Sequence, residues 1–132
     1  MGATIAVEVT FDEAVTVTGT PQLTLETGAS DAVVDYASGS GTTTLTFSYT
    51  IGAGDTAADL DYVATTSLAL NGGTITDAAT NAATLTLATP GAAGSLGFNK
   101  ALVVDTTAPT VTNVTSSTAD GTYGWVRRSP SR

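Results

Sequence analysis

The chain has 132 residues and a formal net charge of −8, and it contains neither Cys nor His. These absences exclude disulfides, Ser-His-Asp and Cys-dependent catalysis, and the usual zinc ligands. So acidic a chain is expected to repel nucleic acid and anionic membranes and to attract divalent cations. The length suits one domain with one core, and no run of about 18 apolar residues predicts a membrane span. We therefore expect no nucleic-acid partner and no membrane insertion, and we place any export signal in a larger parent protein.

Alternation of apolar and polar residues predicts β-strands along most of the chain. The first run, over residues 5–11, puts four large apolar side chains on one face, which is typical of a half-buried strand. Shorter runs with the same period follow at Val15 and Val17, Leu23 and Leu25, Val34 and Tyr36, Leu45 to Ile51, Leu60 and Tyr62, Leu68 and Leu70, Leu85 and Leu87, and Leu102 and Val104. No window shows a helical period, so almost no helix is expected.

Clusters of Gly, Asp, Asn and Ser separate these runs. Ser38-Gly39-Ser40-Gly41 and Asn71-Gly72-Gly73 suit tight turns that need a positive φ. Strands that recur every 8 to 12 residues between such turns indicate an antiparallel β-sandwich.

Four stretches carry a family resemblance: VTFDEAVTVTGTPQLTLETG, SGSGTTTLTFSYTI, LALNGGTITDAATNAATLTL and VVDTTAPTVTNVTSSTADGTYG. In this order they resemble the bacterial Ig-like tandem repeats of giant surface proteins, the SWM-type repeats, over residues 2–124. The resemblance implies an all-β, immunoglobulin-like antiparallel β-sandwich at the bacterial cell surface. It also implies a structural or adhesive role, rather than an enzyme, for a module that neighbours other repeats.

The same resemblance implies that the chain is out of phase with the repeat. Residues 1–107 then form an Ig-like sandwich without its first strand, and residues 108–124 hold the first strand of the next repeat. The segment 125–132 (WVRRSPSR) is basic and differs from the repeat, either as a foreign remnant or as a native linker. A sandwich without its first strand exposes an unpaired edge and part of its core.

Donation of that strand between copies would complete the sandwich. The linker Asp105–Pro109 spans at most about 17 Å when extended, at roughly 3.3 to 3.6 Å per residue. In an end-to-end array the segment that follows the last strand points away from the place of the missing first strand in the same copy. Insertion into a neighbouring repeat or an identical subunit is therefore easier than folding back, and head-to-tail strand donation would build a fibre.

Calcium is the expected cofactor, as a structural ion. Asp55, Asp59 and Asp61 place three carboxylates within seven residues of a loop, and Ca²⁺ prefers several oxygen ligands on a flexible backbone. The alternative is that Asp55 and Asp59 make hydrogen bonds within turns while Asp61 faces solvent from a strand.

A second candidate for calcium is the phrase TDAATNAA, which holds Asp77 and Asn81. It resembles the D-A-A-G-N phrase of the family, with Thr80 in place of the Gly, and this departure puts a left-handed turn in doubt. The alternative is that both side chains cap the turn without a metal. Asp120, in the ADG turn, either binds a cation or is merely solvated.

A third candidate lies at the junction between repeats. Asp105 begins the linker DTTAP, in which Pro109 fixes φ, and Glu13 follows the first alternating strand. If the first two strands of the sandwich are antiparallel, Glu13 returns toward the junction with the preceding repeat. A cation could then join the Asp105 of one repeat to the Glu13 of the next and stiffen the array, unless both carboxylates are merely solvated.

Two other functions compete with the structural one. A carbohydrate- or protein-binding module would use its loops and aromatic side chains such as Tyr62 or Trp125, although aromatic residues make up only 6% of the chain. A hydrolase would use paired carboxylates such as Asp59 and Asp61. We expect the structural role, in an extracellular adhesin or surface fibre.

Overall fold

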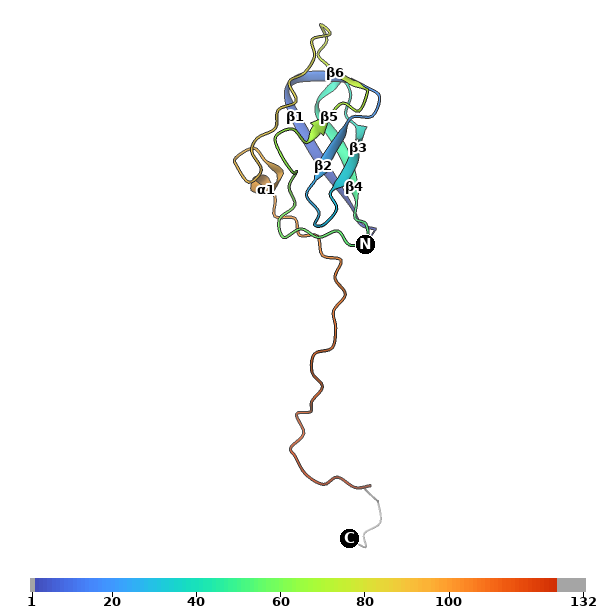
Figure 1. Ribbon diagram of the computed structural model, residues 1–132, viewed down its shortest axis with the longest axis vertical. Helices are drawn as coiled ribbons and strands as arrows, with labels where there is room; N and C mark the ends of the chain where they lie inside the picture. The colour runs from blue at the N-terminus through green and yellow to red at the C-terminus, as the bar shows by residue number, and fades with distance from the viewer. Residues whose placement is uncertain (1, 126–132) are drawn as a thin grey trace.

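Six strands form one curled antiparallel sheet in the computed structural model, which describes residues 2–125 (Figure 1). Along the sheet the order is β5-β2-β3-β4-β1-β6. The bounds are β1 (Thr4–Thr18), β2 (Gln22–Leu25), β3 (Ala32–Ser38), β4 (Thr42–Thr50), β5 (Leu68–Ala69) and β6 (Thr74–Thr76). The all-β prediction is therefore confirmed.

Strand β1 unites two runs that the alternation pattern separated. Its first half pairs with β4 from Thr4 to Thr10, and its last three residues, Thr16–Thr18, pair with β6. The register shifts between Thr10 and Val15. An irregularity of this kind bends a strand and increases its twist, which lets one strand belong to both parts of a curled sheet.

The two predicted turns are confirmed. In the turn between β3 and β4, Gly39 and Gly41 have φ values of 114° and 90°. A Cβ atom on Gly39 would lie 2.2 Å from the Thr44 carbonyl oxygen, so this position has no room for a side chain. In the second turn, Asn71 and Gly72 have φ values of 50° and 79°.

The core lies on the concave side of the sheet. Strand β4 contributes Leu45, Phe47 and Tyr49, which alternate along it and are at most 1% exposed. Side chains at every second position of a strand share one face, and burial of a large apolar side chain stabilises the fold by about 1.5–3 kcal/mol.

Irregular segments, rather than a second regular sheet, cover this core. The alternation pattern was wrong in predicting strands around residues 60–62, 85–87 and 102–104, which form only isolated bridges or none. Over residues 84–88 one backbone bond is made, from Leu87 N–H to the Thr65 carbonyl. Alternation buries one face of such a segment, but a ladder also needs a neighbouring strand along its length.

The one helix among the described residues is α1 (Leu96–Asn99), a single turn capped by the Ser95 side chain. No helix within residues 2–125 is long or apolar enough to cross a membrane.

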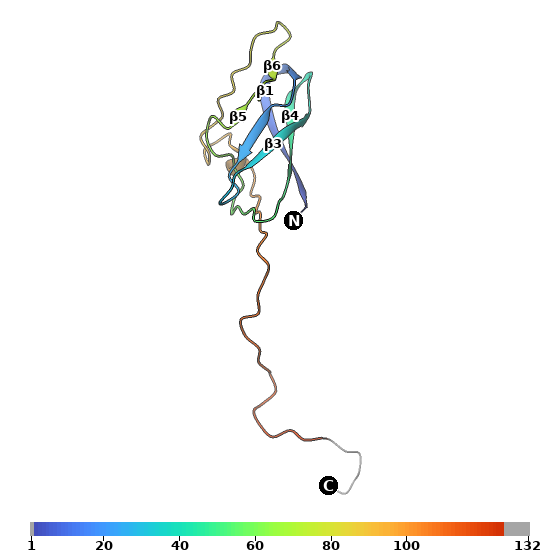
Figure 2. The same ribbon diagram turned by 45° about the vertical axis from the view of Figure 1, so that its right-hand side comes forward.

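Beyond Thr106 the chain leaves the sheet as an extended segment (Figures 1 and 2). It starts from the end of the domain where β1 begins, because Thr106 Oγ1 donates to the Asp55 carbonyl and Gly2 N–H donates to the Ile51 carbonyl nearby. Every residue from 107 to 125 is exposed, and none of them lies in a strand.

Candidate functional site

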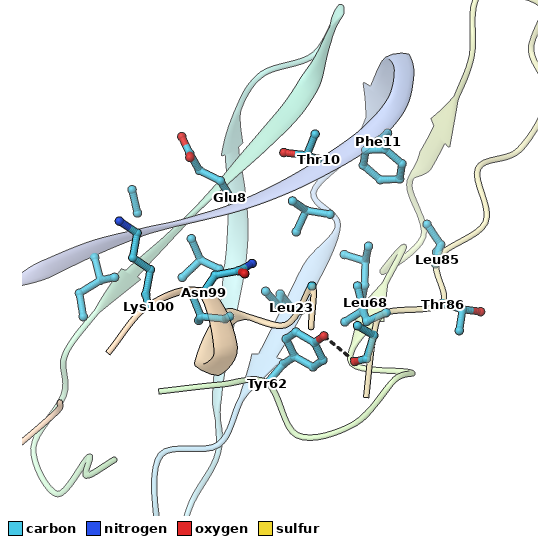
Figure 3. Close-up of a pocket in the computed structure, with 18 of the residues that line it drawn as sticks. Glu8, Thr10, Phe11, Leu23, Tyr62, Leu68, Leu85, Thr86, Asn99 and Lys100 are labelled. Atoms are coloured by element: carbon cyan, nitrogen blue, oxygen red, sulfur yellow. Dashed lines mark hydrogen bonds between the residues drawn. The ribbon is translucent and has the colours of Figure 1, made fainter. Parts of the chain in front are cut away.

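A groove of about 610 Å³ follows the first half of β1 (Figure 3). Residues 5–11 of β1 form one wall. The other wall is formed by residues 84–88 and, at and around α1, by Gly94, Leu96, Asn99, Lys100 and Leu102. Leu23, Tyr62 and Leu68 line it from the side of the core. We call this feature the β1 groove.

The groove opens over apolar side chains that face the core. Val7 is buried, but Ile5, Val9 and Phe11, which share its face of β1, are only partly buried and pack against the core. The partly buried leucines of the opposite wall are Leu85, Leu87, Leu96 and Leu102. The core is therefore incomplete along this line, where further apolar side chains would remove more surface from water.

The backbone edge of β1 along the groove is unpaired over residues 4–11 among the described residues, since β6 reaches only the far end of the strand. Ile51 N–H donates to the Ala3 carbonyl, so Ala3 and Ile51 are an opposed pair joined by a hydrogen bond. Every second residue of β1 after Ala3 therefore directs its backbone groups toward β4. By the alternation of an antiparallel ladder, the N–H and C=O groups of Ala6, Glu8 and Thr10 point away from β4. The groove thus combines apolar side chains with free donors and acceptors.

Several hydrogen bonds hold the opposite wall in place. The Tyr62 hydroxyl donates to the Ala88 carbonyl, as Figure 3 shows. Gly91 N–H donates to Asp61 Oδ2 at 2.9 Å and to Ser95 Oγ at 3.1 Å. Ser95 is fully buried and also accepts from Phe98 N–H, which caps α1. The wall is therefore preformed around polar contacts inside the domain.

Tyr62 is 6% exposed, so it is part of this wall and not a surface aromatic of the kind that a sugar-binding site uses. Burial, and then the charge of Asp61, raise the pKa of its hydroxyl above 10.0. The proton of the bond to Ala88 is therefore retained at neutral pH.

The three loop carboxylates predicted to bind calcium have separate surroundings. Asp55 Oδ2 accepts from the Tyr49 hydroxyl at 2.6 Å and from Gly52 N–H at 3.0 Å. Asp61 accepts from Tyr62 N–H through Oδ1 and from Gly91 N–H through Oδ2, and Asp59 is exposed. Among residues 2–125 no three acidic side chains come together in a group that could hold a metal ion.

The loop after β6 is an Asx-capped turn. Asp77 Oδ1 accepts from Ala79 N–H and Asn81 N–H, and Asp77 Oδ2 accepts from the Asn81 amide at 3.0 Å. These bonds, those of Asn81 first, lower the pKa of Asp77 below 3.8. Thr80 has a φ of 67°, so the left-handed turn is kept although Thr replaces Gly.

The remaining acidic candidates are exposed and far apart in the fold. Glu13 lies in the second half of β1, toward β6. Asp105 lies after Val104, at the end where β1 begins, and its Oδ1 accepts from Thr107 N–H at 2.9 Å. Asp120 lies in the extended segment. Within one copy Glu13 and Asp105 do not meet, and the calcium bridge between copies stays a prediction.

Two features escaped the sequence reasoning. One is the wall of the β1 groove, in which Ser95 caps a single helical turn that is too short to show a period. The other is the pair Glu26 and Asp31, where hydrogen bonding with Asp31, and then its charge, raise the pKa of Glu26. Two acidic residues on either side of Gly28 are the signal that could have indicated this pair.

The basic segment predicted at 125–132 falls outside the described residues except for Trp125, which is 84% exposed. Comparison of the chain with protein-family models, with curated proteins and with solved structures found no match.

Proposed function

We propose that this chain is an immunoglobulin-like repeat of an extracellular bacterial adhesin or surface fibre, and that its work is to extend and stiffen an array of such repeats. The support from the fold is an all-β domain with one incomplete edge and an extended segment that leaves it. The support from the sequence is the resemblance of four stretches to bacterial Ig-like repeats.

The observation that carries the proposal is the course of residues 107–125. Residues 107–124 are rich in Thr and include two valines, yet all of them are exposed and none lies in a strand. Val111 and Val114 are 81% and 86% exposed. Apolar side chains held this far from a core are placed to pack on the next module, so the segment is a connector between repeats.

The test is a chain in which residues 2–124 are followed directly by a second copy of residues 2–124. We expect small-angle X-ray scattering to give a stiff particle about twice as long as one domain, since neighbouring repeats stack and share an interface. Two domains that tumble independently about a loose linker would contradict a stiffening role.

A further inference from the structure

We propose that the β1 groove is a strand-acceptor site, and that its occupant is the segment Thr110–Ser117 of a second copy of this chain. This inference rests on the proposed repeat function and names the partner and the site through which copies join.

The acceptor side of the site offers both backbone and side-chain contacts. The N–H and C=O groups of Ala6, Glu8 and Thr10 lie on the free edge of β1, so an added strand gains regular ladder bonds. Ile5 and Phe11 are partly buried beside this edge and are covered when a strand fills the groove. Backbone bonds supply affinity in this mode of recognition, and the side-chain pockets supply selectivity.

The donor segment matches the acceptor in length and chemistry. Residues 110–117 number eight, as do residues 4–11 of β1, and eight residues of strand span about 26 Å at roughly 3.3 Å each. The segment carries no charge, and Val, Thr and Asn make up its first six residues. Its two valines supply apolar side chains that would cover the partly buried apolar residues of the groove.

The spacing of Val111 and Val114 specifies the form of the added strand. In a regular strand, residues three apart point to opposite faces. One bulge between them adds a residue and turns both valines toward the core. The added strand is therefore bent near Asn113, as β1 itself is irregular between Thr10 and Val15.

The direction of the chain decides that the donor is another copy. β1 begins at the end of the domain from which the extended segment leaves, and it runs toward β6 (Figure 1). If a copy folded its own segment back into the groove, the added strand would be parallel to β1. A segment that arrives from a copy at the opposite end runs antiparallel to β1, as every pair in this sheet does.

Each copy then carries one donor and one acceptor at opposite ends. A contact between two different surfaces does not close on itself unless the rotation forms a ring, so copies add head to tail into an open chain.

Two variants separate the donor from the acceptor. Val111→Asp with Val114→Asp places charges where the added strand meets the core, whereas Val103→Asp, at an exposed valine outside the donor segment, is the matched control. Ala6→Pro removes an N–H that points to the groove. It keeps the hydrogen bonds between β1 and β4 intact, because proline is tolerated where the N–H of a strand lies at a free edge. Circular dichroism checks that each variant is folded.

Sedimentation velocity over a range of concentrations gives the result. We expect the wild type and Val103→Asp to form a concentration-dependent series of species, and each defective variant to weaken assembly at least about tenfold. A 1:1 mixture of the two defective variants should form a dimer and stop, because one intact donor meets one intact acceptor. A synthetic peptide of residues 106–119 in excess should cap the wild-type chain, and the same peptide with Asp at positions 111 and 114 should not.

The inference is overturned if the wild type stays monomeric up to about 1 mM, if both variants assemble like the wild type, or if neither the mixture nor the peptide behaves as stated. Such a result leaves the scattering test of the two-copy chain standing. Conversely, separate chains that assemble through the groove, with a two-copy chain that is flexible, would contradict the stiffening function alone.

Discussion

At the scale of single residues, the loop after β6 holds a β-branched side chain in the left-handed region. Thr80 has a φ of 67°, and its hydroxyl donates to the carbonyl of Ala79. Such a conformation costs a residue with a Cβ atom about 1–2 kcal/mol, and glycine escapes this cost. Asp77 Oδ1 accepts hydrogen bonds from Ala79 N–H and Asn81 N–H, and these bonds hold Thr80 in the left-handed conformation.

We expect Thr80→Gly to stabilise the fold by about 1 kcal/mol, because the relief of strain exceeds the extra freedom of glycine in the unfolded chain. Asn71→Gly is the control. Asn tolerates the left-handed region, and its amide donates to the Thr20 carbonyl, so this change should bring no gain. Urea unfolding measures both, and a loss of stability in Thr80→Gly would refute the account.

The same turn gives a prediction on pH. The pKa of Asp77 is lowered in the folded state, so its carboxylate adds stability that is present above pH 3.8 and is lost as pH falls through the folded pKa. Asp77→Ala should therefore destabilise the fold at pH 7, and the difference from wild type should shrink below about pH 4.

Unfolding free energies at several pH values test this expectation. Asp59→Ala, at an exposed carboxylate, is the control and should show a small difference at pH 7. A cost of Asp77→Ala that is the same at pH 7 and at about pH 2.5 would contradict the role given to the carboxylate.

At the scale of elements, the hairpin of β3 and β4 depends on two glycines that differ in one respect. Both have a positive φ, but a Cβ at Gly39 would lie 2.2 Å from the Thr44 carbonyl oxygen, whereas a Cβ at Gly41 would meet nothing within 4 Å. The Ser40 N–H in this turn donates to the Tyr36 hydroxyl. A side chain would therefore strain the backbone at both Gly39 and Gly41, but it would clash with a neighbouring atom only at Gly39.

We expect Gly41→Ala to cost about 1 kcal/mol from backbone strain alone. Gly39→Ala should cost more than about 2 kcal/mol, because the backbone of β4 must also move. Thermal or urea unfolding of the pair decides the matter. Equal costs at the two positions would show that the close approach to Thr44 does not exist.

At the scale of the whole molecule, the two ends of the domain carry different groups. Glu13 lies toward the β6 end and Asp105 lies at the end from which the extended segment leaves. In a head-to-tail assembly the β6 end of one copy meets the Asp105 end of its neighbour. The assembly would therefore bring together two carboxylates that are far apart in one copy, which is the arrangement a bridging cation needs.

We accordingly predict that calcium raises the share of assembled species in sedimentation velocity, and that a chelator lowers it. Glu13→Gln or Asp105→Asn should remove this dependence, since each takes away one charged ligand. Asp59→Asn should keep it. An identical distribution of species in calcium and in chelator would exclude calcium from the junction and would leave strand donation to be judged on its own test.

The sequence by itself determined which residues face the core and where the chain turns. Alternation at Leu45, Phe47 and Tyr49 marked buried positions, because side chains of a strand alternate between its faces. Gly39 and Asn71 marked turns, because few residues adopt a positive φ at low cost. Both signals are local, so they can be read without knowing the neighbours.

Only the tertiary structure decided which alternating segments pair. Leu85 and Leu87 alternate as clearly as the residues of β4, yet their segment makes one backbone bond, because no strand among residues 2–125 pairs with it. The sequence offered Asp61 as a calcium ligand, and only the tertiary structure showed that it accepts a hydrogen bond from Gly91, which is 30 residues away. Pairing and hydrogen bonding of this kind depend on contacts between distant segments, and local periodicity carries no information about them.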